Sequence, residues 1–500
     1  MSNTRQPVST IDALAALHGD VQVLPASYAQ RRFFVLDQLE GGAAAYTIPI
    51  AQRLTGPLDV VALERALNVV VKRHETLRTV FGVEADDIVQ VVLPVVHIPM
   101  PVDDLGMLGS DERESHVLER AAHNANATFD LTAGPLLRAE LIRLTDNEHV
   151  LLLTMHHIIG DGWSVGVLFD DMERAYAALV AGNTPELPAL ALQYPDFSVW
   201  QHRSALSAAG LRQTAYWTTR LASLPTLDLA TDHPRPPIQT SRGDKREIAI
   251  SPALSESVRV LARRELVTPY VAFLAAWVAL LHRYTSQTDL IVGSITSGRG
   301  RAEVEHLIGP FVNTLAIRSD ASGDPSFREL LQRVRDASTD AIANQDVPFE
   351  QVVEAVQPTR DRSRSPVFQV AFQLLDGLTR DLRLTGVTAS RVAGTKTTTK
   401  FELTLILNAG EDGALRALME YNTDLFSAET ADRMLGHYAV LLESIVRDAA
   451  MPISRLPMLA LTERDQVISH WNATNAPLPR SKSTRLNSSH LRLSRMPSSA

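Results

Sequence analysis

The sequence predicts an α/β fold built from more than one domain. Residues 150–155 are almost all apolar, mostly leucine or β-branched, which is typical of a strand buried on both faces. Gly160 and Gly162 interrupt this strand, and apolar residues at helical spacing follow it: Leu168, Met172, Ala175, Tyr176 and Leu179. A chain of 500 residues is also too long for a single hydrophobic core, which indicates two or three domains.

Composition excludes several classes of function. The chain has no cysteine, so disulfides, thiolate metal sites and a cysteine nucleophile are excluded. The formal net charge of −9 argues against a nucleic-acid-binding protein. The start, Met1 to Pro7, lacks the apolar core of a signal peptide, and the apolar run Val271–Leu281 is too short to span a bilayer of about 30 Å as a helix. A cytoplasmic protein with no membrane partner is the simplest interpretation.

Two adjacent histidines, His156 and His157, stand where the apolar strand ends. An unpaired buried polar group costs about 1–3 kcal/mol, so buried strands rarely carry such residues without a reason. Strand ends commonly hold the chemistry of α/β folds, and a histidine can take a proton from a nucleophile or hold one in a transition state. Because strand side chains alternate, the two imidazoles point to opposite faces and only one can face a given cavity.

The turn after the histidines carries Asp161 and Ser164. Asp161 could orient the imidazole of His157, or pair with an arginine to fix the loop. Ser164 is a good N-cap for the helix that follows. The alternative interpretation of the whole stretch is a satisfied pair of core histidines beside a turn aspartate.

The other elements follow from similar patterns. Ser27 caps a helix over residues 27–39, and Thr268 followed by Pro269 starts a helix whose buried body is 271–281. Four prolines and several charges mark 223–247 as the clearest change of composition. The remaining expected elements are strands at Ile48–Leu54, Leu137–Leu144, Leu290–Val292 and Leu415–Tyr421, and helices at Leu58–Val71 and Leu425–Ile445.

Residues 156–162 resemble HHxxxDG, the signature of the condensation domains of nonribosomal peptide synthetases, which belong with the chloramphenicol acetyltransferase-like acyltransferases. Further stretches resemble other motifs of this family in order: Ser27–Leu39, Arg73–Phe81, Tyr194–Gln201, Ile308–Leu315, Asp346–Glu350 and Arg362–Phe372. The sequence departs from the pattern at Phe33-Phe34, where Leu or Met and Trp or Tyr are commoner, and at Asn344, where histidine is usual. The resemblance covers roughly residues 22–475.

The resemblance implies two chloramphenicol acetyltransferase-like lobes in a V-shaped pseudo-dimer with a channel between them. The expected divisions are a leader (1–21), an N-terminal lobe with the HHxxxDG motif (22–222), an inter-lobe passage (223–247), a C-terminal lobe (248–457) and a linker toward a missing adenylation domain (458–479). Residues 293–301 are expected to form a loop that reaches toward the other lobe beneath the active site.

The reaction implied by the resemblance is amide formation between a donor acyl or aminoacyl thioester on one peptidyl carrier protein and an acceptor amine on another. No metal and no cofactor of the chain's own are implied, because both carriers bring phosphopantetheine arms. The expected partners are these carriers and a downstream adenylation domain. The motif over 27–39 and the ending Asp161-Gly162-Trp163-Ser164 favour an L-amino acyl donor.

His157 is the residue expected to take the proton of the attacking amine, or to position that amine. His156 is expected to face inward and be structural, and Gly162 to lend a backbone N–H to the developing oxyanion. The resemblance implies that Arg73 supports the active-site loop by pairing with Asp161. Arg78 is a weaker candidate for the same role. The remaining expected residues are Ser164 and Asn313 near the site and Trp200 in the core.

Three rival functions differ in sequence features. A free-standing coenzyme A-dependent acyltransferase would need only HxxxDG, without the other motifs. An epimerase of the same fold would usually lack the glycine at position 162. A noncatalytic recruitment domain would have a degraded histidine motif, whereas this motif is intact.

The last residues have a different composition. Arg480–Ala500 holds five basic residues and no acidic one, and Ser481–Ala500 resembles the translation of a sequencing-library adapter. The alternative is a natural disordered basic tail. We interpret 480–500 as a non-native, adapter-derived tail and assign it no function.

Overall fold

The computed structural model describes residues 10–40, 46–359, 361–375, 380–392, 398–410 and 414–473. Contacts divide the chain into a large unit, Met1–Met458, and a small unit that begins at Leu459. Within the small unit the described elements are α14 (Leu461–Asp465) and the π-helical turn η3 (Gln466–His470). The predicted tail, 480–500, lies outside the described residues.

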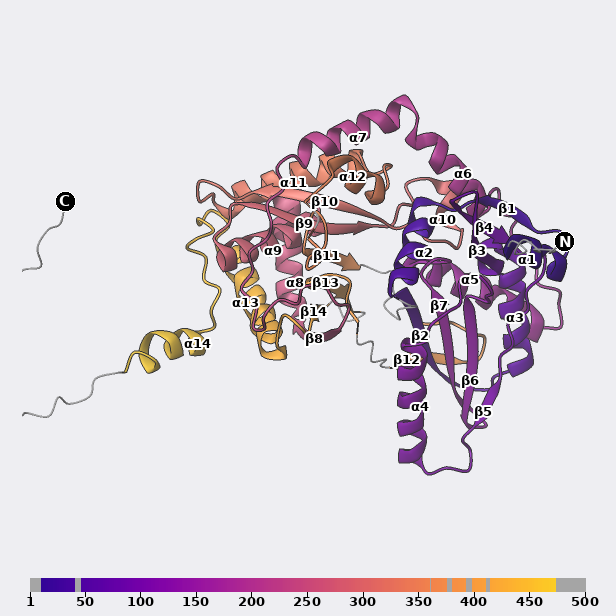
Figure 1. The fold of residues 1–500 in the computed structure, drawn as a ribbon. Coiled ribbons are helices and arrows are strands. Elements are labelled where there is room, and N and C mark those ends of the chain that lie inside the picture. Colours follow the sequence, from indigo (N-terminus) through magenta and orange to yellow (C-terminus); the bar gives the residue numbers. More distant parts are fainter. Residues whose placement is uncertain are drawn as a thin grey trace, which may run out of the picture. The chain divides into compact units, whose positions relative to one another are not determined.

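The first half of the large unit combines strands and helices in an α/β arrangement (Figure 1). Its elements are α1 (Thr10–His18), β1 (Gln22–Pro25), α2 (Tyr28–Glu40), β2 (Thr47–Thr55), α3 (Val60–Arg73), the 3₁₀ turn η2 (Glu75–Arg78), β3 (Thr79–Glu84), β4 (Asp87–Val92), β5 (Val102–Asp104), α4 (Ser110–Ala125), β6 (Leu137–Thr145), β7 (Glu148–His156), α5 (Gly162–Val180), α6 (Tyr194–Ala205) and α7 (Ala208–Arg220).

The second half repeats this mixture around another sheet (Figure 1). Its elements are β8 (Gly243–Ile250), α8 (Pro252–Arg264), α9 (Pro269–Thr285), β9 (Asp289–Thr296), α10 (Ala302–Glu305), β10 (Asn313–Asp320), α11 (Phe327–Ala343), α12 (Phe349–Val356), β11 (Val370–Leu375), β12 (Thr388–Arg391), β13 (Leu403–Ala409), β14 (Leu415–Asn422) and α13 (Ala428–Arg447).

Three sheets organise the large unit. One has five strands in the order β12-β2-β7-β6-β5, another has six in the order β10-β9-β11-β13-β14-β8, and a small one has three in the order β1-β4-β3. Strand β12 comes from the second half but pairs antiparallel with β2 of the first, with Thr388 opposite Thr55 and Arg391 opposite Gln52. The two halves of the chain therefore share a sheet.

Strand β7 lies inside the five-stranded sheet, between β2 and β6. Leu151, Leu153 and Met155 belong to the core that includes α3 and α5. Val150 and Leu152 point the other way, into a smaller core with α4. Because helices cover both faces, every position along this strand can be apolar, and the predicted doubly buried strand is confirmed.

Helix α9 is the centre of the second core. Every residue from Val271 to Leu281 is buried, among α8, α11, α13 and the six-stranded sheet. Oγ1 of Thr268 accepts the backbone N–H of Val271 at 3.3 Å, and Pro269 stands in the first turn, so the predicted helix start is confirmed. Across the described part of the chain, no helix on its own has the length and apolarity to cross a membrane, and α8 and α9 meet that test only as a pair bent by 105°.

The range 223–247, predicted as the passage between lobes, ends in regular structure because β8 begins at Gly243. Trp217 of α7 is already part of the second core. The domain boundaries proposed from the sequence stay predictions.

Candidate active site

His157 lies in the turn immediately after β7. Its backbone N–H donates to the carbonyl of Tyr46 at 2.7 Å. Its ring stacks on Phe33 of α2, with 5.5 Å between ring centroids and 20° between planes. Its Nε2 atom lies 3.4 Å from Nζ of Lys400, which belongs to the second half of the chain. The imidazole is half-buried, so the backbone and Phe33 orient it while solvent or a ligand can still reach it.

His156 is the last residue of β7, and its side chain is buried with 1% exposed. Its Nδ1 accepts the backbone N–H of Ile158 at 3.1 Å. Burial lowers the pKa of His156 to about 4, and the positive charge of Lys400 acts in the same direction. The imidazole is therefore neutral at neutral pH. The burial agrees with the predicted inward orientation, and the purely structural role of His156 stays a prediction.

Asp161 caps the helix that carries the turn. Helix α5 begins at Gly162, and Oδ1 of Asp161 accepts the backbone N–H of Ser164 at 2.8 Å. The prediction that Ser164 is the N-cap is wrong. The N-cap is Asp161, whose carboxylate accepts a backbone N–H that has no acceptor within the helix. The hydroxyl of Ser164 instead lies 2.7 Å from Oδ1 of Asp161 and stabilises the same carboxylate.

The cation that pairs with Asp161 is Arg299, from the second half. Nη2 of Arg299 lies 3.3 Å from Oδ1 of Asp161, and both side chains are buried. The predicted pairing of Arg73 with Asp161 is wrong. Arg73 ends α3, which packs against α5, and its Nε donates to Oδ2 of Asp171 at 2.9 Å. Of the two roles considered for Asp161, the pairing with an arginine is the one observed.

Arg299 binds the loop that follows it as well as Asp161. Its Nη1 donates to the carbonyls of Val304 at 2.6 Å and Leu307 at 2.7 Å, and its guanidinium carbon lies 4.1 Å from the ring centroid of Phe311. The backbone N–H of Phe311 donates to Oδ2 of Asp161 at 3.0 Å. Burial lowers the pKa of Arg299, and the charge of Asp161 opposes that shift. Residues 299–311, which we call the clamp loop, therefore satisfy both oxygens of Asp161.

The backbone of the clamp loop at Gly309 lies very close to its neighbours, and this closeness lets the loop contact the turn. At Gly309, a Cβ atom would lie 2.0 Å from Cδ2 of Tyr194, whose ring is fully buried. The hydroxyl of Tyr194 lies 2.7 Å from Oγ of Ser27 and donates to the carbonyl of Pro310 at 3.1 Å. The N–H of Gly309 donates to Oγ of Ser164 at 3.1 Å. Ser27, expected only as a helix cap, thus also ties α2 to this network.

Two of the predicted supporting residues act elsewhere. Arg78 donates to the carbonyl of Leu93 and lies 3.4 Å from Glu75, so it does not contact the turn. Nδ2 of Asn313 donates to the carbonyls of Gln345 and Val347, each at 2.8 Å. Asn313 therefore holds the chain ahead of α12 rather than facing His157.

Trp200 is not a core residue, contrary to the prediction. Its ring is half-buried, and the guanidinium of Arg301 lies 4.6 Å from the ring centroid. It lines a cavity of about 320 Å³ together with Asn313 and Phe311. Cation–π contact with Arg301 explains why an aromatic residue stays at this partly open position.

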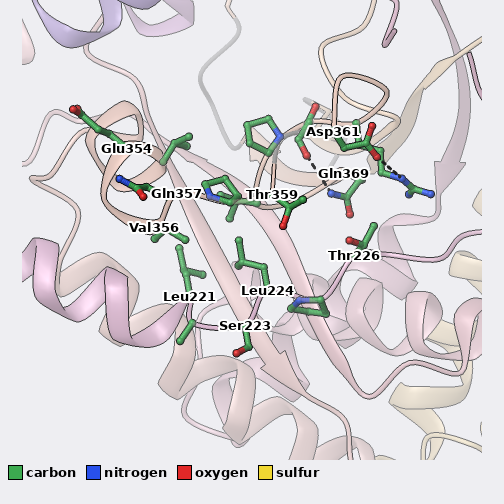
Figure 2. Close-up of a pocket in the computed structure, with 18 of the residues that line it drawn as sticks. Leu221, Ser223, Leu224, Thr226, Glu354, Val356, Gln357, Thr359, Asp361 and Gln369 are labelled. Atoms are coloured by element: carbon green, nitrogen blue, oxygen red, sulfur yellow. Dashed lines mark hydrogen bonds and ion pairs between the residues drawn. The ribbon is translucent and has the colours of Figure 1, made fainter. Parts of the chain in front are cut away.

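A larger cavity has a volume of about 1390 Å³ (Figure 2). It is lined by the end of α7, by residues 222–226, by α12 and by the segment that leads into β11. Figure 2 shows Leu221, Leu224 and Thr359 around it. His157 is not among its lining residues, so its volume gives no measure of the reaction site.

Sequence reasoning missed three residues that the structure places at the turn: Arg299, Lys400 and Phe33. The loop that contains Arg299 was expected to reach the other lobe; the structure shows that Arg299 contacts Asp161 of the first half of the chain, and the division into lobes stays a prediction. The arginine itself carried no separate signal. Lys400 lies outside every motif, and Phe33 was noted only as a departure from a motif.

Comparisons with known proteins identify the family of this chain. The profile of the condensation domain matches residues 21–468. A linear gramicidin synthase chain of Brevibacillus parabrevis is 42% identical over 465 residues, which are 92% of this chain and 9% of that protein. The chain thus spans only a small part of that relative's length.

Solved structures give the same result. The complex of the X-domain and OxyB from teicoplanin biosynthesis aligns with a TM-score of 0.78 and 29% identity, over 88% of this chain and 96% of that chain. A four-domain nonribosomal peptide synthetase bound to AMP and glycine aligns with a TM-score of 0.78 and 23% identity, over 89% of this chain and 34% of that chain, and shares the fold. These alignments confirm the predicted acetyltransferase-like α/β fold.

Proposed function

The chain belongs to the condensation-domain family of nonribosomal peptide synthetases, a family of peptide-bond-forming acyltransferases, and we propose that it joins two substrates held on carrier proteins. The donor is an acyl or aminoacyl thioester, with an L-amino acyl group as the expected donor. The acceptor is the amine of an aminoacyl thioester. The observation that carries the proposal is the oriented imidazole of His157 at the end of β7, held in a turn that the clamp loop fixes.

The proposed step needs no oxidant, reductant or metal. The nitrogen lone pair of the acceptor attacks the carbonyl carbon of the donor thioester, so that a C–N bond forms and the C–S bond breaks. The amine loses one proton, and the departing thiolate of the donor's phosphopantetheine arm gains one. Both arms belong to the substrates.

His157 contacts the acceptor amine in this proposal. Nε2 either accepts the proton that the amine loses or positions the amine for attack. The backbone N–H of Gly162, in the first turn of α5, is proposed to donate to the oxyanion, since the first amides of a helix lack intrahelical acceptors. Asp161, Ser164 and Arg299 act by holding the turn, and Arg73 acts one step further away by fixing α5 through Asp171.

The proposed partners follow from the kind of relatives that match. The gramicidin synthase chain is much longer than this one, and the four-domain synthetase contains three further domains. We therefore propose a donor carrier, an acceptor carrier and a neighbouring adenylation domain as partners, in the cytoplasm. The two lobes with a channel between them belong to the same proposal.

The test uses the full chain with a loaded donor carrier and a loaded acceptor carrier, and intact-protein mass spectrometry of the acceptor. The wild type is expected to add the donor acyl mass to the acceptor. His157→Ala is expected to lower the rate by about 10²-fold or more, because general acid–base catalysis contributes 10²–10⁴. His97→Ala, a change at an exposed histidine 3.2 Å from Glu64, is the matched control and should keep the wild-type rate.

Two results would contradict the proposal. A His157→Ala rate near that of the wild type would remove His157 from the reaction. Transfer from acyl-coenzyme A to a free amine, with carrier masses unchanged, would make the chain an ordinary acyltransferase.

A further inference from the structure

The hydroxyl of Tyr194 joins three parts of the chain that surround the reactive turn. Tyr194 begins α6, and its side chain is buried with 1% exposed. Its hydroxyl donates to the carbonyl of Pro310 in the clamp loop at 3.1 Å. Because a carbonyl can only accept, the hydroxyl of Ser27, 2.7 Å away and just before α2, donates to the Tyr194 oxygen. One phenol thus links α6, α2 and the clamp loop.

Helix α2 carries the aromatic ring that orients the reactive imidazole. Phe33 stacks on His157, with 5.5 Å between ring centroids. At the start of the same helix, Oγ of Ser27 accepts the backbone N–H of Gln30 at 3.2 Å, so the Tyr194 hydroxyl is bound to the residue that caps α2. Because hydrogen bonds join successive turns of a helix, a shift of its first turn moves Phe33 as well.

The clamp loop holds the other part of the site, the turn after His157. The residues on either side of Pro310 donate backbone N–H groups to that turn: Gly309 to Oγ of Ser164 at 3.1 Å, and Phe311 to Oδ2 of Asp161 at 3.0 Å. The Tyr194 hydroxyl therefore connects the support of the imidazole ring with the support of the turn.

Other contacts keep α2 attached to α6 without this hydroxyl. Further residues of α6 bind backbone groups of residues 25–28: Ser198 donates to Pro25 at 2.7 Å, His202 donates to Ala26 at 2.9 Å, and Gln201 accepts from Tyr28 at 3.2 Å. The ring of Tyr194 also packs on Phe311, with 4.9 Å between centroids. A phenylalanine at position 194 would keep all of these contacts, so it removes the hydrogen bonds of the hydroxyl and little else.

We propose that the hydroxyl of Tyr194 is a positioning group that keeps the imidazole of His157 aligned with the reactive turn. The proposal rests on the proposed function, in which Nε2 of His157 contacts the acceptor amine and Gly162 donates to the oxyanion. Phe33 sets the place of the imidazole and the clamp loop sets the place of the turn, so the link between them sets their relative position. A misplacement of about 1 Å can cost about 10²-fold in rate. Tyr194 acts through these neighbours and not by contact with the substrates.

The first experiment measures the rate of amide formation at several concentrations of the loaded acceptor carrier. Tyr438→Phe is the matched control for Tyr194→Phe, because Tyr438 is also buried and its hydroxyl donates to the carbonyl of Phe273 at 3.0 Å within the second core. Tyr194→Phe is expected to lower kcat about tenfold and to change KM by less than about twofold, because alignment in the transition state is lost while binding is kept. Tyr438→Phe should keep both values.

A second readout follows His157 itself and needs no substrate. In protein with isotope-labelled histidine, the ring current of Phe33 shifts the NMR signal of the His157 imidazole, which is assigned by its loss in His157→Gln. Tyr194→Phe is expected to move or broaden this signal, and Tyr438→Phe to leave it in place.

Ser27→Ala tests whether the link runs through α2. It removes the same hydrogen bond from the other side, together with the helix cap. The loss of the cap is the same with or without the Tyr194 hydroxyl, so it cancels in a double-mutant cycle. The fall in kcat of Ser27→Ala combined with Tyr194→Phe should therefore be smaller than the product of the two single falls.

Three results would overturn the proposal. They are an equal fall of kcat in Tyr194→Phe and Tyr438→Phe, a wild-type kcat with an unchanged His157 signal in Tyr194→Phe, and falls that multiply in the double variant. A wild type that forms no amide would instead overturn the proposed function, and the His157 signal would still decide whether Tyr194 positions the imidazole.

Discussion

Asp161 and Asp171 lie on the same helix and both accept from an arginine, yet they hold different parts of the molecule together. Asp161 caps the start of α5 and pairs with Arg299 of the second half. Asp171, in the body of α5, is bound by Arg73 and by Nε2 of His74 at 2.8 Å, both from the first half. The first pair ties the reactive turn to the clamp loop, and the second only fixes α5 on α3.

The energetic difference follows from burial. Asp161 and Arg299 have 0% and 1% of their side chains exposed, whereas Asp171 and Arg73 have 9% and 13%. Removing one partner of a fully buried ion pair leaves an uncompensated charge, which costs about 3–5 kcal/mol. A partly exposed partner can regain water, so the same change at the second pair costs less.

The largest expected effect is therefore that of Asp161→Ala. It should lower the free energy of unfolding by about 3–5 kcal/mol, measured by urea denaturation, because it strands Arg299 and the N–H of Phe311. Asp171→Ala should cost about 1–3 kcal/mol and leave the amide-forming rate per folded molecule close to that of the wild type. Equal losses of stability and rate in the two variants would show that the clamp has no special link to the turn.

Asp161→Asn sharpens the comparison. The amide oxygen can still accept the backbone N–H of Ser164, so the helix cap survives while the charge facing Arg299 is lost. The difference in the free energy of unfolding between Asp161→Asn and Asp161→Ala then measures the loss of the helix cap and the cavity. The difference between the wild type and Asp161→Asn measures the loss of the ion pair.

The same comparison explains what the sequence could predict. Strand β7, helix α9 and the helix after the turn were predictable because their signals are local: apolar periodicity, prolines and capping residues. The partners of Asp161 could not be predicted. Arg299 lies 138 positions away, and which arginine reaches Asp161 depends on how the two sheets are arranged. The error about the helix cap was local, since Asp161 and Ser164 are both good N-cap residues. The family resemblance located the reactive turn, but assigned its arginine to Arg73.

A second prediction concerns pH and compares two buried histidines, His156 at the end of β7 and His74 beside Asp171. Burial lowers the pKa of His156 to about 4, and burial also lowers that of His74, against the opposing charge of Asp171. In the unfolded chain a histidine titrates near 6.5, so between about pH 6.5 and 4 the unfolded state binds protons that the folded state does not. Stability should therefore fall as the pH falls through this range.

The contribution of His156 alone should reach about 3 kcal/mol at pH 4, because its pKa is roughly 2.5 lower in the folded chain than in the unfolded chain. His156→Gln should remove that part of the slope, and the slope due to His74 should remain. The measurement is the urea midpoint at a series of pH values. An unchanged slope in His156→Gln would mean that this imidazole is protonated in the folded state.

The smallest expected effects come from two glycines, Gly309 in the clamp loop and Gly166 in α5. A Cβ at Gly309 would lie 2.0 Å from the ring of Tyr194, and that ring is buried and hydrogen-bonded, so it has little room to move. Gly309→Ala should cost about 1–3 kcal/mol, as expected for overpacking. At Gly166, within α5, no atom lies within 4 Å of an added Cβ. Gly166→Ala should instead stabilise the protein by about 0.5–1 kcal/mol, since alanine favours the helix.

Thermal unfolding of both glycine variants tests whether the clamp loop acts through close contact. Opposite signs are expected, with the amide-forming rate lowered only in Gly309→Ala, because that change pushes the clamp loop away from Ser164 and Asp161. If Gly309→Ala were as stable as the wild type and equally active, the clamp loop could shift without disturbing the turn. The long-range pair of Asp161 and Arg299 would then be a tether rather than a rigid support for His157.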